Sequence, residues 1–232
     1  MDLIAAGLVG ALRKIAELDP DVVEAASASL VVTGSATALS IVAGVPLGVV
    51  LGLTRFPGRT FTLSVTNTGM GLPPVVVGLF VAVAIWRSGP FGQLDWYCTR
   101  QAMVVAQFIL AFPTVVGLTA IAIQGIDPML RLQVRALGAT SLQTAWILVS
   151  EAKLLILTAA MAGFGAVISE IGASLMTGCN IKGDTRILTT AIALETSKGE
   201  FATAFALGFI LLALIFAVNA VTTWAQQRQR PA

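Results

Sequence analysis

The amino-acid sequence predicts an all-α integral membrane protein, in which about five helices span the bilayer as one bundle. Two observations predict this class. The 232 residues are 56% hydrophobic and only 11% charged, with a mean hydropathy of +0.89, whereas soluble domains carry about 25% charged residues. The apolar residues also gather into stretches of roughly 20, which is the length of a membrane-spanning helix.

Five stretches meet this length. They are residues 29–53, 64–87, 102–124, 154–172 and 203–224. Two longer breaks separate them, a segment with its own helix signals at 125–153 and a Gly/Thr-rich segment at 173–202. We therefore expect a single transmembrane domain over residues 29–224, followed by a cytoplasmic tail at 225–232.

Residues 3–18 predict a shorter, amphipathic helix that lies in the membrane interface. Its apolar side carries Ile4, Leu8, Leu12, Ile15 and Leu18. Its charged side carries Arg13, Lys14 and Glu17. Together with a linker it accounts for residues 1–28. The alternative is a poorly ordered terminus, because chain ends often fray.

The composition also argues against several classes of function. The chain contains no histidine, which removes the commonest metal ligand and the commonest general base near neutral pH. We therefore expect no metal site and no catalytic residue, so a membrane enzyme is disfavoured. The net charge of +2 comes without a long basic run, which argues against a nucleic-acid partner.

The two cysteines, Cys98 and Cys179, are far apart in the sequence and do not form a CxxC motif. A zinc site or a thioredoxin-like site is therefore not expected. Both fall in segments expected on the outer side, where an oxidising compartment permits a disulfide. Free, partly buried thiols are the favoured expectation.

The basic residues do not decide the orientation. If the turn at Arg55 and Arg59 faces inward, alternation of the spans gives seven basic residues on each side. The inner set is Arg55, Arg59, Arg131, Arg135, Lys153, Arg228 and Arg230. The outer set is Arg13, Lys14, Arg87, Arg100, Lys182, Arg186 and Lys198. The positive-inside rule counts basic residues, so only the tight arginine turn and the basic C-terminus favour this orientation.

Small residues and prolines mark the first three spans. The first span has a ridge of residues four apart, Ala36, Ser40, Gly44, Gly48 and Gly52. Such a ridge permits close helix packing, either within the chain or, as the alternative, at a subunit interface. The second span contains Asn67 and the pair Pro73-Pro74, and the third contains Gln107 and Pro113. Prolines break the helical hydrogen-bond ladder, which suggests a moving pathway or, alternatively, static kinks.

The segment 125–153 predicts two short helices joined at a glycine. Asp127 and Pro128 form a helix start, because Asp caps well and Pro fits the first helical position. Gly138 then interrupts the helix, and Ser141 is expected to cap a second one. A loop this ordered on the inner side is suited to docking a partner, and the alternative is a surface helix resting on the lipid headgroups.

This loop resembles the coupling loop of type I ABC importer permeases. The resemblance rests on Asp127-Pro128, on the run Ala136–Thr140 and on Trp146. The family's Glu-Ala-Ala falls where this chain has Leu132-Gln133-Val134. Further segments are similar to the tungstate permease family, namely Arg55–Arg59, Gly69–Leu79, Ile168–Ala173, Gly178–Gly183, Thr185–Ile192 and Glu195–Gly199. Cys179 stands where the family has Gly.

The resemblance implies the permease subunit of an ATP-driven importer in the bacterial or archaeal cytoplasmic (inner) membrane. Such permeases are homodimers that work by alternating access with two cytoplasmic ABC ATPase subunits and a periplasmic or extracellular oxyanion-binding protein. ATP and Mg would be bound by the ATPase, with no cofactor in this chain. The implied cargo is tungstate, with molybdate or sulfate as alternatives. A different class, an ion-coupled secondary carrier, would need an inverted repeat or more buried ionisable residues.

Two sets of candidate residues follow. The candidate ATPase-coupling residues are Arg131, Arg135, Gly138, Ala139, Thr140 and Ser141. The candidate pathway or gate residues are Asn67, Pro73, Pro74, Glu170, Asn180, Thr189 and Thr190. Glu170 is interpreted as a gate or helix-pairing residue, because a carboxylate repels an oxyanion. For Thr189 and Thr190 the alternative is helix capping or packing. Lys182 and Arg186 are expected to attract anions to the outer mouth.

Overall fold

The computed structural model of the chain describes residues 2–17 and 19–228. Its elements in chain order are α1 (Asp2–Ala16), α2 (Pro20–Leu53), α3 (Arg59–Met70), α4 (Pro74–Ile85), the short 3₁₀ helix η1 (Gly92–Leu94), α5 (Arg100–Gln124), α6 (Pro128–Ala136), α7 (Ser141–Glu151), α8 (Lys153–Ile168), α9 (Gly172–Gly178), α10 (Leu188–Ser197) and α11 (Phe201–Arg228).

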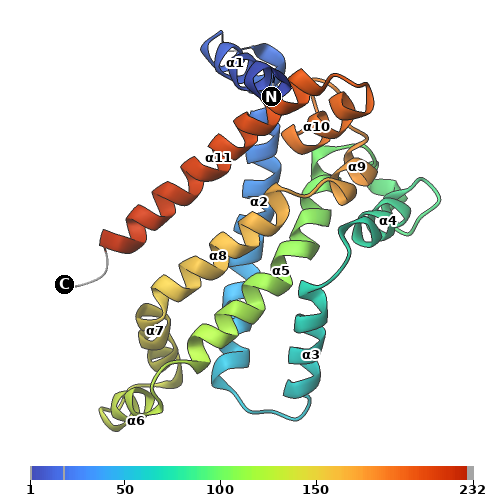
Figure 1. Ribbon diagram of the computed structural model, residues 1–232. Coiled ribbons are helices and arrows are strands. Elements are labelled where there is room, and N and C mark those ends of the chain that lie inside the picture. Colours follow the sequence, from blue (N-terminus) through green and yellow to red (C-terminus); the bar gives the residue numbers. More distant parts are fainter. Residues whose placement is uncertain (1, 18, 229–232) are drawn as a thin grey trace.

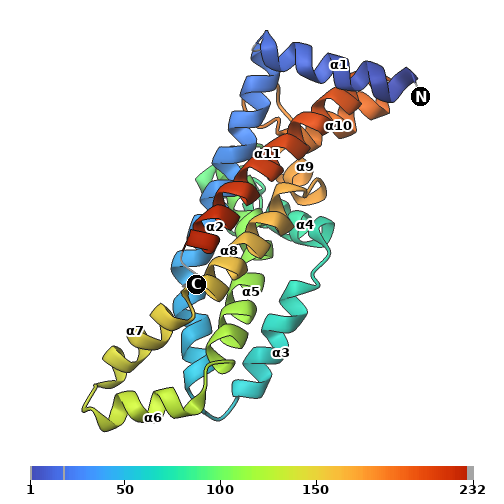
Figure 2. The ribbon, with the colours of Figure 1, turned by 60° about the vertical axis from the view of Figure 1, so that its left-hand side comes forward.

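The helices form an elongated bundle around α5, which contacts α2, α3, α4, α8 and α9 (Figure 1). One end of the bundle, which we name the α1 end, carries α1, α9, α10 and the loop 86–99. The opposite end, the α6 end, carries the turn 54–58 with α6 and α7. Figure 2 shows α1 and α6 at opposite extremes of the molecule.

The expected number of five spans is confirmed among the described residues if each bent pair of helices is counted as one span. Three helices, α2, α5 and α11, are each long and apolar enough to cross a membrane. Two further spans come from helix pairs, α3 with α4, bent by 99°, and α7 with α8, bent by 70°. The break between α3 and α4 falls at Pro73-Pro74, as the sequence indicated. The expected span 154–172 is wrong as a single helix, because α8 ends at Ile168.

The first span is longer than expected. It begins at Pro20, and not at residue 29, so the predicted linker is part of a 34-residue helix of about 51 Å. The Asp19 carboxylate accepts a hydrogen bond from the Asp21 N–H, and Pro20 occupies the first turn. Asp caps the free N–H groups of a helix start and Pro needs no partner there, so these two residues fix the helix start.

The ridge of small residues on α2 packs within the chain. A Cβ added at Gly48 would lie 2.6 Å from the Cβ of Thr119, and one added at Gly52 would lie 2.7 Å from a methyl group of Ile123, both on α5. Small side chains therefore let α2 and α5 approach closely. This confirms intramolecular packing over the alternative of a subunit interface.

The expected break in the third span is wrong. Pro113 lies inside α5, which runs without interruption for 25 residues. The proline ring packs where α3 comes close, because a Cβ at Gly69 would lie 2.7 Å from the Pro113 Cγ. The contact with α3 fills the space beside the ring and the helix continues past it.

The N-terminal helix is present and packs across the start of α11 at the α1 end. Gly7 permits this close approach, because a Cβ at this position would collide with the Phe205 Cβ. The apolar side chains of Ile4, Leu8, Leu12 and Ile15 are exposed, as an interfacial helix requires. Leu18 and residues 229–232 of the expected tail lie outside the described residues, and α11 covers 225–228 of that tail.

Candidate functional site

The predicted coupling loop folds as helix, glycine and helix at the α6 end. The Asp127 carboxylate accepts a hydrogen bond of 2.8 Å from the Met129 N–H and so caps α6, as expected. The second cap is Thr140 and not Ser141, which is the first residue of α7. Thr140 is the favoured cap because Gln143, three residues later, completes a capping box with it.

Gly138 supplies the turn between α6 and α7. Its φ of +86° is left-handed, and a Cβ there would meet no atom within 4 Å. Glycine adopts this conformation without steric cost, whereas other residues pay about 1–2 kcal/mol. The requirement for Gly at this position is therefore one of backbone conformation and not of space.

The coupling loop exposes large apolar side chains. Leu137 is 87% exposed, Leu142 82% and Trp146 73%. Met129 and Leu132 on α6 are also more than half exposed. Leu137, Leu142 and Trp146 line one apolar groove, and large apolar side chains grouped in this way indicate an interaction site.

The loop is tied to the bundle by arginine. Arg131 Nη1 donates a hydrogen bond of 2.9 Å to the carbonyl of Leu53, at the C-terminus of α2. Arg59 Nε donates one of 2.9 Å to the carbonyl of Leu51. From the sequence we use Arg55 and Arg59 only as evidence on the orientation. Their closeness along the chain to the C-terminus of α2 was a signal that arginines could bond to carbonyl groups there. Arg135 is exposed.

The seven candidate pathway residues lie on α3, at the bend between α3 and α4, and around α9 and α10. Asn67 lies exposed on α3, and Pro73 and Pro74 lie exposed at the bend before α4. The remaining four, Glu170, Asn180, Thr189 and Thr190, lie in the region of α9 and α10. The start of α4 packs against the start of α9, because a Cβ at Gly172 would lie 2.5 Å from a methyl group of Val75. The bend at Pro73 and Pro74 is therefore next to the segment that carries Glu170.

Glu170 is the centre of a buried polar network. Its carboxylate accepts hydrogen bonds from the backbone N–H of Ala173 at 2.7 Å and of Ser174 at 3.1 Å, and from the Ser174 hydroxyl. Ser174 in turn accepts a bond from Gln107 on α5. A carboxylate at the start of α9 satisfies the free N–H groups of that helix, so Glu170 links α8, α9 and α5.

The hydroxyl groups of Thr189 and Thr190 form hydrogen bonds within the chain, as their structural alternative requires. The Thr189 hydroxyl donates to the Glu170 carbonyl at 3.0 Å. The Thr190 hydroxyl accepts from the Ile187 N–H at 3.1 Å, which caps α10. Asn180 is left-handed, with φ of +54°, and its amide nitrogen donates to the Thr190 carbonyl. These polar groups are therefore used in holding α9 and α10 together.

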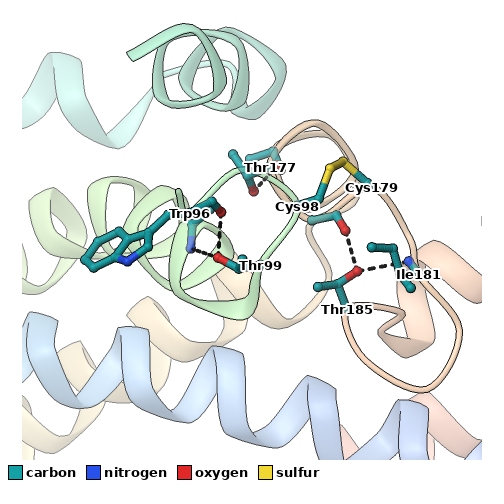
Figure 3. Close-up of a disulfide and its surroundings, with 10 residues drawn as sticks. Trp96, Cys98, Thr99, Thr177, Cys179, Ile181 and Thr185 are labelled. Carbon is teal, nitrogen blue, oxygen red and sulfur yellow. Dashed lines mark hydrogen bonds between the residues drawn. A yellow bond between two sulfur atoms is a disulfide. The ribbon is translucent and has the colours of Figure 1, made fainter. Parts of the chain in front are cut away.

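Cys98 and Cys179 form a disulfide, so the expectation of free thiols is wrong. Figure 3 shows the bond joining the loop before α5 to the end of α9. Beside it the Cys98 N–H donates to the Thr177 carbonyl at 3.0 Å. The Thr185 hydroxyl bridges the Ile181 N–H and the Gly178 carbonyl (Figure 3). Sequence separation of 81 residues gave no sign of this proximity.

The charges at the α1 end are largely paired. Lys182, expected to attract anions, forms an ion pair of 2.7 Å with Asp21. Arg186 is half-buried and donates to the Asn180 carbonyl. At the start of α2, a hydrogen bond from Lys14 lowers the pKa of Asp19 below its ordinary value. Over residues 2–17 and 19–228, no group of three or more His, Cys, Asp or Glu side chains could hold a metal ion.

Comparison with known proteins gives a consistent family. The family model described as "Binding-protein-dependent transport system inner membrane component" matches residues 44–231. A "Probable anion ABC transporter permease protein" of Haloferax volcanii is 43% identical over 83% of this chain and 85% of its own length. The "Tungstate uptake system permease protein TupB" of Peptoclostridium acidaminophilum is 36% identical over 95% and 97%.

A more distant relative and the solved structures extend this result. The "Molybdenum transport system permease protein ModB" of Escherichia coli K12 is 29% identical over 87% of this chain and 92% of its own. A chain from inward facing structures of the MetNI methionine ABC transporter superposes with a TM-score of 0.77. It is 19% identical and is covered over 99% of its length, with 93% of this chain. The expected type I importer bundle is thereby confirmed as the fold.

Proposed function

Because the chain belongs to the family of binding-protein-dependent transport system inner membrane components, we propose that it is the permease of an ATP-driven oxyanion importer. The proposed cargo is tungstate, since a tungstate permease is similar over nearly the whole of both chains. Molybdate is the second candidate, supported by the lower identity to a molybdenum permease.

The observation that carries the mechanism is the helix–glycine–helix unit at the α6 end. Its exposed apolar side chains, among them Leu137, Leu142 and Trp146, offer a docking surface for a cytoplasmic ATPase. The ATPase would bind ATP and Mg and hydrolyse the nucleotide. The bond from Arg131 to the Leu53 carbonyl connects α6 with α2, so a displacement of α6 by the ATPase would be passed to the bundle. Arg135, Gly138, Ala139, Thr140 and Ser141 complete this proposed coupling surface.

The disulfide supports one orientation of the chain in the membrane. Disulfides persist in oxidising compartments and are rare in the cytosol. The Cys98–Cys179 bond therefore supports an α1 end that faces the periplasm or the exterior, where the binding protein would dock. The α6 end then faces the cytoplasm, which is the orientation that the tight arginine turn and the basic C-terminus also favour. The membrane is the cytoplasmic (inner) membrane of a bacterium or archaeon.

The pathway is proposed to lie between two copies of the chain. α3 exposes the polar side chains of Ser64, Asn67 and Thr68, and polar groups at membrane depth rarely face lipid. A second copy facing α3 would enclose them together with the bend at Pro73 and Pro74. In this arrangement Glu170, Asn180, Thr189 and Thr190 support the outer gate by holding α9 and α10 in place, without binding the anion.

Replacement of Gly138 tests the coupling role. We expect Gly138→Val to reduce ATP-driven tungstate uptake by at least tenfold, since a β-branched residue at positive φ distorts the turn between α6 and α7. Uptake is measured in vesicles that contain the permease, its ATPase and the binding protein. The amount of inserted protein is measured in parallel and should stay unchanged.

The matched control is Gly138→Asn. Asn tolerates the left-handed conformation far better than Val, so this variant should keep most of the uptake although it also adds a side chain. Normal uptake by Gly138→Val would contradict the coupling role. Uptake driven by an ion gradient without any ATPase would contradict the importer itself.

The cargo is tested by stimulation of the ATPase. The complex is incubated with binding protein loaded with tungstate, molybdate or sulfate, and ATP hydrolysis is compared. Tungstate should give the largest stimulation at the lowest concentration. A larger response to molybdate would keep the importer and replace its cargo.

A further inference from the structure

A polar cavity of about 390 Å³ lies at the α6 end, below the C-terminus of α2. We name it the arginine cavity. Its lining residues are Gly52, Leu53, Thr54, Arg55, Arg59, Ile123, Gln124, Ile126, Asp127, Pro128, Arg131 and Leu148. They come from the ends of α2, α5 and α7, the starts of α3 and α6, and the turns between them. The cavity is therefore a meeting point of the bundle and the coupling loop.

The charge of this cavity is positive and unbalanced. Three arginines, Arg55, Arg59 and Arg131, face a single carboxylate, Asp127. That carboxylate already accepts the Met129 N–H as the cap of α6. Among the described residues, none of the three guanidinium groups forms an ion pair with a carboxylate, and every ion pair of the described chain involves residues of the α1 end.

Two of the guanidinium groups are held in place at the cavity wall. Arg59 is bonded to the Leu51 carbonyl and Arg131 to the Leu53 carbonyl, each at 2.9 Å. Each bond uses one nitrogen, so each guanidinium keeps further N–H donors. Pre-positioned guanidinium forks match the oxygen atoms of tetrahedral oxyanions, to which they donate pairs of hydrogen bonds.

We propose that the arginine cavity binds a tetrahedral oxyanion group through Arg55, Arg59 and Arg131. The volume is sufficient, because a water takes about 30 Å³ and the cavity would hold roughly a dozen, enough for such an anion with part of its hydration shell. Two sources supply this chemistry at the α6 end, a free tungstate ion after its release and the phosphate of an anionic lipid. The choice of tungstate as the free anion rests on the proposed function, whereas the site itself does not.

The test measures binding and not transport. The full chain is purified with its ATPase into nanodiscs of phosphatidylcholine, which carries no net charge, without ATP or binding protein. Tungstate binding is measured by equilibrium dialysis, with tungsten quantified by mass spectrometry and binding to the ATPase alone subtracted. We expect Arg55→Gln to weaken saturable binding by roughly tenfold, the loss of one charged hydrogen-bonding partner.

Arg55 is the better site for substitution, because no hydrogen bond of the described structure uses its side chain. Arg131→Gln provides a second variant with the same expected direction. The matched control is Lys153→Gln, which removes one positive charge from an exposed residue at the start of α8, outside both the cavity lining and the proposed coupling surface. It should change binding by less than about twofold, since an exposed charge acts weakly through salt-containing water.

A second measurement tests whether an anionic lipid occupies the arginine cavity. Phosphatidylglycerol retained by the purified complex is counted by native mass spectrometry. If the lipid phosphate is the occupant, Arg55→Gln should lose a retained lipid that Lys153→Gln keeps, and phosphatidylglycerol nanodiscs should abolish tungstate binding. Either ligand, lost with Arg55→Gln but not with Lys153→Gln, supports the site.

Three outcomes overturn the proposal. They are the absence of both ligands, an equal loss in Arg55→Gln and Lys153→Gln, and binding to the isolated chain that disappears when the ATPase is added. The last result would mean that acidic groups of the ATPase fill the cavity. Uptake can be normal in each case, so failure of this site is distinguishable from failure of the importer function.

Discussion

The two ends of the bundle differ in how their charges are satisfied. At the α1 end, ion pairs join separate elements, such as Lys182 with Asp21 and Arg100 with Asp184, and a disulfide adds a covalent link. At the α6 end, the described residues form no ion pair, and the cationic side chains meet a cavity or solvent. The α1 end is therefore cross-linked within the chain, whereas the α6 end keeps its charged and apolar groups available to partners.

The backbone shows the same difference. Four non-glycine residues in left-handed conformation, Asp95, Cys98, Cys179 and Asn180, all lie in loops of the α1 end. At the α6 end the left-handed residues of the described chain are Gly58 and Gly138, where a Cβ would meet no neighbour. Side chains at positive φ persist when surrounding contacts hold them. Tight contacts thus hold the loops of the α1 end, whereas glycines occupy the left-handed positions described at the α6 end.

The largest expected effect comes from removing the disulfide. A variant with Cys98→Ser and Cys179→Ser should lose about 2–4 kcal/mol of stability, because the bond restricts the unfolded chain. The thermal unfolding midpoint in detergent measures this loss. Reductant should lower the midpoint of the native chain and leave the variant unchanged. If reductant did not change the midpoint of the native chain, the disulfide would not contribute to the difference between the two ends.

The left-handed φ of +59° at Cys179 sharpens the same test. In a Cys98→Ala background, Cys179→Gly should be more stable than Cys179→Ala by about 1 kcal/mol, since Gly adopts positive φ freely. The two midpoints are compared directly. Equal midpoints would show that the loop relaxes once the bond is gone.

The next effect is at Glu170. Glu170→Ala leaves the N–H groups of Ala173 and Ser174 buried without an acceptor, at a cost of about 1–3 kcal/mol. Ser174→Ala removes only hydroxyl contacts and should cost less. The thermal midpoint and vesicle uptake are measured together. Loss of uptake with an unchanged midpoint would assign Glu170 to a moving gate instead of a structural support.

The smallest effect is at the junction of α1 and α2. Lys14→Gln should cost less than about 1 kcal/mol, as for other partly exposed ion pairs. The native Asp19 has a lowered pKa, so its contribution is complete above its ordinary pKa and is lost as pH falls through the lowered value. Amide hydrogen exchange of residues 2–16, corrected for intrinsic pH dependence, should show acid loosening in the native chain. A loosening of equal size in Lys14→Gln would contradict the role of this pair.

Several elements could be predicted because their causes are local. Asp127 and Pro128 start α6, Pro73 and Pro74 break the second span, and Gly138 turns the coupling loop. The same Asp-Pro signature at Asp19 and Pro20 starts α2, but hydropathy placed the start at residue 29. Capping residues locate a helix end more sharply than apolar content, which only marks the part of the helix in lipid.

The remaining features depend on contacts between distant segments. The bend between α7 and α8 falls at Ala152, where neither Gly nor Pro gives a local signal. The pairing of Cys98 with Cys179 and the assembly of the arginine cavity each join segments that the sequence places far apart. The network of Gln107, Ser174 and Glu170 likewise forms only when α5 packs against α9.

The disulfide also closes a covalent ring. Its 81-residue separation encloses α5, α6, α7, α8 and α9, so the loop at the α6 end belongs to a ring fastened at the opposite end. A protease that cuts between α6 and α7 would open this ring without releasing a fragment. The cut chain would migrate as one molecule until reductant separates it into two pieces.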